Sequence, residues 1–220
     1  MMIELRNVKK TYNSDGVRVG ALRGIDLKIE AGEYLTVMGQ SGSGKSTLLH
    51  ILGTMDKLSE GQYFYNDTEV SALSKKEADE FRKNHIGFVF QNYALMKYYT
   101  VYENIEVPLL AKGISKKERR RIIEQNMEAV GIADLRKKLP VHISGGQMQR
   151  CAIARALAAD NDILLADEPT GALDRKTGEE IMDVFDKIRS SERTIILVSH
   201  DEKIAARTER IVRIEDGRIV

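Results

Sequence analysis

"GQSGSGKST", residues 39–47, is the stretch that decides the fold. It fits the pattern G-x-x-x-x-G-K-[ST] of a phosphate-binding loop. An expected strand, "YLTVM" at 34–38, precedes it, and apolar residues at helical spacing follow it over 46–55. This strand–loop–helix context favours a phosphate site over a glycine-rich connector, because the helix start adds the positive end of a dipole.

Each position of the loop has a chemical reason. Glycines let the backbone wrap phosphate oxygens, Lys45 neutralises charge on the β- and γ-phosphates, and the Ser46 hydroxyl can reach Mg²⁺. The residues expected to touch the nucleotide are Gly39, Ser41, Gly42, Ser43, Gly44, Lys45, Ser46 and Thr47.

Polar side chains follow three other apolar runs. In "ILLADEPTGALD" (163–174), Asp167 is expected to hold Mg²⁺ through water and Glu168 to polarise an attacking water. An isolated acidic pair at a strand end is more often a solvated turn or a helix cap, but a phosphate loop in the same chain favours phosphoryl chemistry. His200 follows "TIILVS" (194–199) and is expected at the same sheet edge, facing the γ-phosphate. Gln91, after "IGFVF" (86–90), can touch Mg²⁺ or the attacking water.

The patterning predicts an α/β fold. Short strands are expected at 2–8 and 25–30, and the continuous apolar runs at 86–90, 163–166 and 194–199 are typical of parallel strands covered on both faces. Residues 92–160 carry helical patterning, and Asp216-Gly217 indicates a terminal hairpin. We therefore expect one α/β core, about 1–91 and 161–220, with an inserted helical subdomain at about 92–160.

Composition excludes several classes. The chain has 220 residues with 42% hydrophobic and 30% charged residues, as in ordinary globular proteins. Its 34 basic and 33 acidic side chains leave a net charge of +1, which offers no general attraction to nucleic acid. Cys151 cannot form an internal disulfide, and no apolar run approaches the ~18 residues that span a bilayer. We expect a cytoplasmic protein that reaches a membrane only through a partner.

A second glycine-rich helix start follows a hundred positions later, in "HISGGQMQRCAIARAL" (142–157). Ser144, Gly145 and Gly146 precede an alanine-rich run, and backbone N–H groups at such a start suit an anion. A single phosphate loop does not explain why the chain needs another.

Taken in order, "GQSGSGKST", Gln91, "ISGGQ", "ADEPTGALD" and "SHD" resemble the nucleotide-binding domain of ABC transporters over essentially the whole chain. "ISGGQ" is the most specific element, because it is similar to that family's LSGGQ signature. Ile143 replaces the usual Leu, and Gln40 stands where relatives often carry Pro; neither change removes a phosphate donor.

The resemblance implies a P-loop NTPase core of mostly parallel sheet with an N-terminal antiparallel β-subdomain and the helical insertion. It implies that two copies pair head to tail around two Mg-ATP molecules, with Glu168 as the base. Ser144, Gly145, Gly146 and Gln147 would then contact ATP bound to the opposite phosphate loop, and Asp174 would cross the same interface. It also implies an ATPase that drives membrane permease subunits from the inner face of the cell membrane.

Motif wording around "FVFQNYALMKYYTVYENIEVPLL" is most similar to the subgroup that serves macrolide exporters, lipoprotein-releasing transporters and antimicrobial-peptide resistance or sensing transporters. This resemblance favours export of a hydrophobic or peptide-like compound, with antibiotic resistance as one role. Two alternatives stay open: a sensing or signalling complex that moves little cargo, and a soluble, non-transport ABC ATPase. The single phosphate loop and the lack of an extended heptad run count against the last.

Three further features each have a structural and a functional interpretation. Tyr12 can stack on adenine or simply pack in a β-subdomain. A cluster of four tyrosines, Tyr93, Tyr98, Tyr99 and Tyr102, is either ordinary packing or, as we hypothesise, a groove for a helix of the membrane subunit. The basic run "SKKERRR" (115–121) is better explained as a solvated helix face than as a lipid contact.

Overall fold

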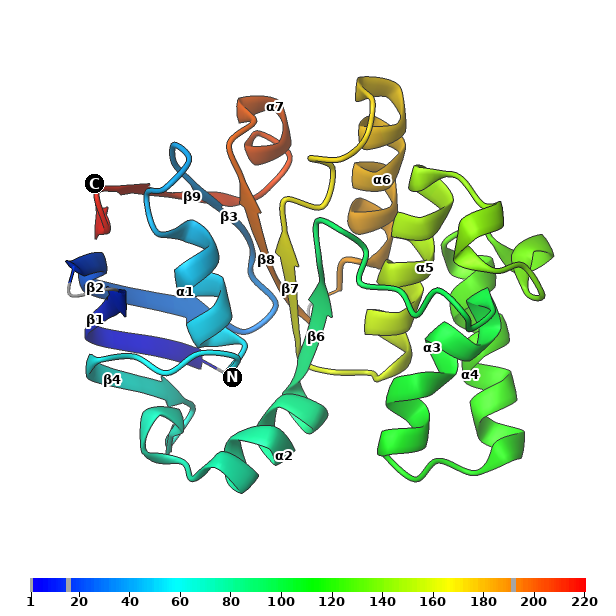
Figure 1. The fold of residues 1–220 in the computed structure, drawn as a ribbon, viewed down its shortest axis with the longest axis horizontal. Coiled ribbons are helices and arrows are strands. Elements are labelled where there is room, and N and C mark those ends of the chain that lie inside the picture. Colours follow the sequence, from blue (N-terminus) through cyan, green and yellow to red (C-terminus); the bar gives the residue numbers. More distant parts are fainter. Residues whose placement is uncertain (1, 15–16, 191–192) are drawn as a thin grey trace. The chain divides into compact units, whose positions relative to one another are not determined.

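The computed structural model describes residues 2–14, 17–190 and 193–220 (Figure 1). The chain forms two compact units. The first unit consists of Met1–Arg82 and Ser190–Val220, and the second unit is the intervening segment Lys83–Arg189. No helix in the described residues is both long and apolar enough to cross a membrane.

The first unit contains an antiparallel sheet in the order β2-β1-β4-β5. Its strands are β1 (Met2–Ser14), β2 (Val17–Glu30), β4 (Glu60–Tyr65) and β5 (Thr68–Glu69). Burial alternates along β2, where Ile25, Leu27 and Ile29 are buried, and Ile3 of β1 pairs with both Ile29 and Tyr65. The expectation of strands at 2–8 and 25–30 was too short, because antiparallel pairing continues along the polar ends of both strands.

The first unit also contains the strands that carry the phosphate loop. Here β3 (Tyr34–Met38) lies between β8 (Thr194–Ser199) and β9 (Arg210–Glu215), parallel to both, and β9 turns back into β10 (Arg218–Ile219). Asp216 and Gly217 have φ of 45° and 75°, so the predicted hairpin is confirmed. The helices of this part are α1 (Lys45–Leu52), α2 (Lys75–His85), the 3₁₀ turn Val70–Ala72 and α7 (Glu202–Ala205).

Helix α1 is shorter than the expected 46–55. It ends where Gly53 caps it, and the chain then turns so that the Met55 N–H donates to the His50 carbonyl at 2.8 Å. Strand β8 is buried along its whole length, which confirms the interpretation of the apolar run at 194–199 as a covered parallel strand, and β3 is buried in the same way.

The second unit pairs two parallel strands, β6 (Ile86–Val89) and β7 (Ile163–Asp167), with a set of helices. The helices are α3 (Val101–Ala111), α4 (Lys116–Ala129), the 3₁₀ turns Ala133–Leu135 and Pro140–His142, α5 (Gly145–Ala158) and α6 (Arg175–Ile188). Figure 1 shows α3, α4 and α5 gathered together, all from the segment where helical patterning was expected. The fold is thus α/β as predicted, while the subdomain limits at 92 and 160 stay a prediction.

The basic run at 115–121 begins α4 after the Ser115 cap. Arg120 pairs with Glu124 one turn later, Arg121 pairs with Glu118, and Arg119 pairs with Glu106 at 2.8 Å. The Arg120 and Arg121 pairs within α4 are exposed and agree with the solvated-face interpretation, whereas Arg119 is largely buried and pairs with Glu106 of α3.

Candidate functional site

The phosphate loop connects β3 to α1 in the first unit. Gly42 and Gly44 have φ of 81° and 107°, a region that side chains disfavour. A Cβ on Gly44 would lie 2.5 Å from the Ala21 carbonyl oxygen, so the loop also passes too close to β2 for any larger residue. Gly42 and Gly44 therefore take a backbone conformation that side chains disfavour, and at Gly44 the close approach of β2 also excludes a side chain.

The polar groups of the loop are arranged for an anion. Lys45 is buried, and its ammonium group donates to the carbonyl oxygens of Gly39 and Gln40, each at 2.8 Å. Among the described residues, the buried Ser43 hydroxyl has no hydrogen-bond partner, and no side chain caps α1. The first N–H groups of a helix lack intrahelical acceptors, so this start is open to a ligand oxygen.

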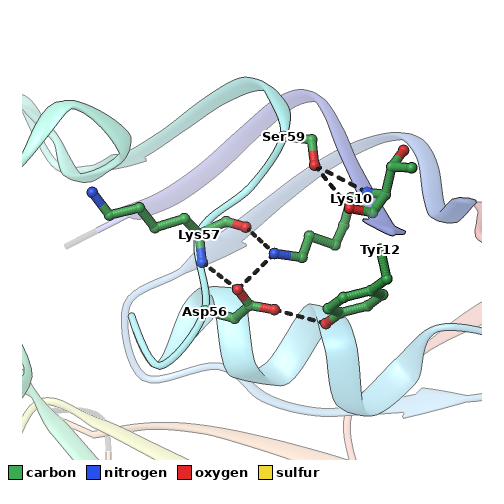
Figure 2. Close-up of polar contacts among 6 residues, drawn as sticks. Lys10, Tyr12, Asp56, Lys57 and Ser59 are labelled. Atoms are coloured by element: carbon green, nitrogen blue, oxygen red, sulfur yellow. Dashed lines mark hydrogen bonds and ion pairs between the residues drawn. The ribbon is translucent and has the colours of Figure 1, made fainter. Parts of the chain in front are cut away.

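Tyr12 takes part in a small polar network with Lys10 and Asp56 (Figure 2). The Tyr12 hydroxyl donates to Asp56 at 2.7 Å and is also hydrogen-bonded by the side chain of Thr47 in the loop. The Lys10 ammonium lies 4.7 Å from the centre of the Tyr12 ring and 2.6 Å from the other Asp56 oxygen. Burial, and then the Asp56 carboxylate, raise the pKa of Tyr12, which keeps the phenol protonated as a donor.

Tyr12 as a residue is 40% exposed, so the network fixes its hydroxyl end while part of the side chain stays accessible. Sequence reasoning missed Lys10 and Asp56. No motif marks them, since Asp56 lies 44 positions from Tyr12 along the chain.

His200 lies directly beyond β8. Ser199 is the register partner of Met38, so His200 and the phosphate loop leave neighbouring parallel strands at the same edge of the sheet. This placement brings His200 and the loop to one edge of the sheet within the first unit. Its expected position beside Asp167 and Glu168 stays a prediction.

Asp167, Glu168 and Gln91 occur together in the second unit. Val89 is the register partner of Ala166, so Gln91 and the acidic pair follow neighbouring parallel strands at one edge. A Cβ on Gly171 would lie 3.0 Å from the Gln91 amide nitrogen and 3.4 Å from the Glu168 Cβ. The absence of a side chain at Gly171 thus lets Gln91 and Glu168 approach each other.

Glu168 has an unusual backbone. Its φ is 44°, although it carries a side chain and precedes a proline, which normally restricts a residue to extended backbone. Such strain concentrates at functional sites, because the surrounding structure must hold it in place.

The second glycine-rich start forms the N-terminus of α5. The Ser144 hydroxyl accepts from the Gln147 N–H at 3.3 Å, and the Gln147 side-chain oxygen accepts from the Ser144 N–H at 3.0 Å. This reciprocal pair is a capping box, which the spacing S-x-x-Q predicts and which sequence reasoning overlooked. The N-terminus that suits an anion is therefore partly closed by its own side chains.

Neighbouring elements fit closely around this start. A Cβ on Gly146 would lie 2.5 Å from the Thr177 methyl group, and one on Gly145 would lie 3.0 Å from the Tyr93 hydroxyl. Asp174 caps α6 by accepting from the Thr177 N–H, and the Thr177 hydrogen bonds lower the pKa of Asp174. Asp174 thus has a structural role in its own chain beside the role expected across an interface.

Two polar residues of α5, the half-buried Arg155 and the buried Gln149, were not predicted. Arg155 donates to the carbonyl oxygens of Tyr93 and Ala94, which both have positive φ, and so holds the segment after Gln91. Gln149, fully buried, donates to the Pro169 carbonyl at 2.7 Å.

The tyrosine cluster divides into two kinds. Tyr98 and Tyr99 are 92% and 47% exposed and adjoin the exposed Met96, so they form an apolar surface of the second unit. Tyr93 and Tyr102 are half-buried, and Arg136 covers the Tyr102 ring at 4.3 Å.

Comparison with known proteins gives close matches. A family model described as ABC transporter matches residues 22–171. The ABC transporter ATP-binding protein YknY of Bacillus subtilis (strain 168) is 45% identical over 219 residues, which cover 100% of this chain and 95% of that protein. The macrolide export ATP-binding/permease protein MacB of Escherichia coli (strain K12) is 41% identical over 219 residues, but the chain spans only 34% of its length.

Solved structures agree with these matches. The dimeric post-hydrolysis state of the ATP-binding cassette MJ0796, bound to ADP and Pi, is 40% identical and superimposes with a TM-score of 0.91. The match covers 99% of this chain and 96% of that one. A second dimeric structure of the same bacterial ABC transporter cassette, 41% identical, has the same TM-score.

Proposed function

Because the chain belongs to the ABC transporter family and is the ATP-binding and ATP-hydrolysing subunit of such a transporter, we propose that two copies pair head to tail around two ATP molecules. In this pair, the signature residues Ser144–Gln147 and Asp174 of each copy complete the site on the phosphate loop of the other. ATP closes the pair, closure drives the membrane subunits, and hydrolysis reopens it. The dimeric, ADP- and Pi-bound state of a 40% identical cassette supports this reading.

The observation that carries the proposal is the contrast between the two glycine-rich helix starts. The start of α1 has no side-chain cap and leaves its first N–H groups to a ligand, whereas the start of α5 caps itself through Ser144 and Gln147. A site that holds ATP whenever ATP is present suits the first arrangement. A site that meets phosphate only when a partner arrives suits the second, because the cap satisfies its donors in the meantime.

We assign the nucleotide as follows. The phosphates lie on the loop at 39–47, where Lys45 exchanges its two carbonyl partners for phosphate oxygens. The adenine stacks on the exposed ring surface of Tyr12, whose hydroxyl end is held by Asp56 and Thr47. Stacking carries no base-specific code, so selectivity among nucleoside triphosphates is expected to be weak.

Magnesium is assigned to Ser46, Gln91 and Asp167. Each offers an oxygen, the ligand atom that Mg²⁺ prefers, and the exposed Ser46 and partly exposed Asp167 leave those oxygens reachable. When bound, the ion supplies charge neutralisation on the phosphate oxygens.

Glu168 is assigned as the base that accepts a proton from the attacking water. Gln91, which approaches Glu168 across Gly171, orients that water, and His200 stabilises charge that develops on the γ-phosphate. The strained backbone of Glu168 supports this assignment, because strain of that kind is retained where orientation of a side chain matters.

Glu168→Gln tests the assignment of the base. The amide keeps the size of the side chain and cannot accept the proton, so hydrolysis should fall by about three orders of magnitude while ATP binding persists. Size-exclusion chromatography with ATP should then reveal a trapped dimer. Turnover at the parent rate would remove Glu168 from this role.

The permease partner is assigned to the exposed Met96, Tyr98 and Tyr99, together with the half-buried Tyr93 and Tyr102. Tyrosine suits such a contact, since it offers apolar area and a hydrogen-bonding group at low entropic cost. The likeness to MacB supports export of a hydrophobic or peptide-like compound, with the chain bound to its permease at the inner face of the membrane. Residues 92–160 would act as the helical subdomain that contacts the permease.

Tyr98→Ala combined with Tyr99→Ala tests the contact surface. Both side chains are exposed, so the isolated subunit should keep its stability and ATPase rate, while transport by the complete complex falls at least about ten-fold through loss of two interface anchors. Lys97→Ala, in the same exposed segment, is the matched control. Full transport in the double variant would place the contact elsewhere.

A further inference from the structure

Hydrogen bonds to the carbonyl groups of Glu168 and Pro169 hold the turn that carries Glu168. Glu168 has left-handed backbone before a proline, and its carbonyl accepts from the Gly171 N–H at 2.9 Å. Pro169 has no N–H, so its carbonyl is the only backbone group through which hydrogen bonding can fix it. That carbonyl accepts from the side chain of Gln149 at 2.7 Å.

Gln149 is an energetically unfavourable residue at this buried position. Its side chain is fully buried on α5, and within the described part of the chain its amide oxygen has no hydrogen-bond partner. An unsatisfied buried polar group destabilises the folded chain, which Leu or Met at the same position would avoid. Among the described residues, the hydrogen bond that this amide makes is the one it donates to the Pro169 carbonyl.

We propose that Gln149 is a positioning residue for ATP hydrolysis. Its buried amide donates a hydrogen bond to the Pro169 carbonyl and thereby holds the strained Glu168 backbone, and with it the carboxylate, in one orientation. The inference rests on the proposed role of Glu168 as the base. Without this hydrogen bond, the backbone of Glu168 relaxes toward the extended conformation that a residue before proline prefers, and its carboxylate leaves its position.

The hydrogen bond from Gln149 to Pro169 also links two parts of the proposed site, the start of α5 and the turn that carries Glu168. Gln149 lies one helical turn after Gly145 on α5, so the helix whose start is assigned to the partner's ATP also holds the turn of the base. A displacement of α5 when two copies close would therefore be passed to Glu168 through a single hydrogen bond.

Gln149→Met removes the donor and keeps the length and the buried area of the side chain. We expect kcat to fall about ten-fold, while KM and the ATP affinity measured without turnover stay within about two-fold, because only the base is misplaced. Ile153→Val, a buried truncation one turn further along the same helix, is the control for a small loss of packing. A parent-like kcat, a decrease no larger than in the control, or a matching loss of ATP affinity would overturn the proposal.

Gln149→Glu gives a readout that packing alone would not move. A protonated carboxyl group can donate to the Pro169 carbonyl, whereas a carboxylate would repel it, and burial raises the pKa of the introduced group. The kcat of this variant, relative to the parent, should therefore decrease as the pH rises. A pH profile parallel to that of the parent would overturn the proposal even if Gln149→Met failed to fold.

The same measurements separate this inference from the proposal that it rests on. If Glu168→Gln still hydrolysed ATP, the assignment of the base would fail. If Glu168→Gln were inactive while Gln149→Met kept the parent kcat, only the positioning role would fail.

Discussion

The starts of α1 and α5 are two versions of the same local structure, a small-residue turn that opens a helix. At α1 the turn depends on Gly42 and Gly44 with positive φ, and no side chain caps the helix. At α5 the turn depends on Ser144, whose hydroxyl joins Gln147 in a capping box. The first is complete only with a ligand, whereas the second is complete by itself and must exchange its cap for one.

The difference explains how the two phosphate sites that we propose for one chain can respond differently to an anion. An uncapped start gains most from an anion, because its donors have no other partner. A self-capped start gains less, since binding must first displace side-chain hydrogen bonds of about 1 kcal/mol each. We therefore expect substitutions at the two starts to affect ATP binding to very different degrees.

Lys45→Ala should have the largest effect on binding. Loss of the ammonium group removes a charge-assisted contact with the phosphates, so ATP affinity should fall at least about 100-fold. Equilibrium binding of a fluorescent ATP analogue to the isolated subunit measures this. An affinity within a few-fold of the parent would mean that the loop is not the primary site.

Asp56→Ala should have an intermediate effect, which depends on the adenine base of the nucleotide. The substitution frees the Tyr12 hydroxyl and the Lys10 ammonium, so the ring loses its fixed orientation, and ATP affinity should fall about five-fold through weaker stacking. Inorganic tripolyphosphate, which has no base to stack, is the control ligand. An equal loss for both ligands would indicate damage to the loop instead.

Ser144→Arg should have the smallest effect on binding and a large one on turnover. The side chain no longer caps α5 and blocks the surface where a second copy would bring its ATP, so affinity should stay within about two-fold while hydrolysis is lost. Ser144→Thr, which keeps a capping hydroxyl, is the matched control. Reduced binding of ATP by Ser144→Arg would mean that α5 acts on the phosphate of its own chain.

Sequence was informative where chemistry is local. The phosphate loop, the strands around it and the polar residues at the ends of β6, β7 and β8 follow from short patterns of glycine, apolar and acidic residues. The capping box at Ser144 is also local and was predictable from its spacing.

Sequence was silent where the partner is distant. Asp56 reaches Tyr12 across 44 positions, Gln149 reaches Pro169 across 20, and Arg155 reaches Tyr93 across 62. Each joins a side chain to an element that only the folded chain brings near. The left-handed backbone of Glu168 was equally hidden, because glutamate normally avoids it and the surrounding contacts impose it.

Mixing two inactive variants tests most directly the claim that the two helix starts serve different ATP molecules. Lys45→Ala lacks a working phosphate loop, and Ser144→Arg lacks a working signature, so neither should hydrolyse ATP alone. If each site takes its loop from one copy and its signature from the other, a mixed dimer holds one intact site, and an equal mixture should recover about a quarter of the parent activity, since half of randomly formed dimers are mixed. No recovery in a mixture shown to contain the mixed dimer would mean that loop and signature act within one chain, and would contradict the account.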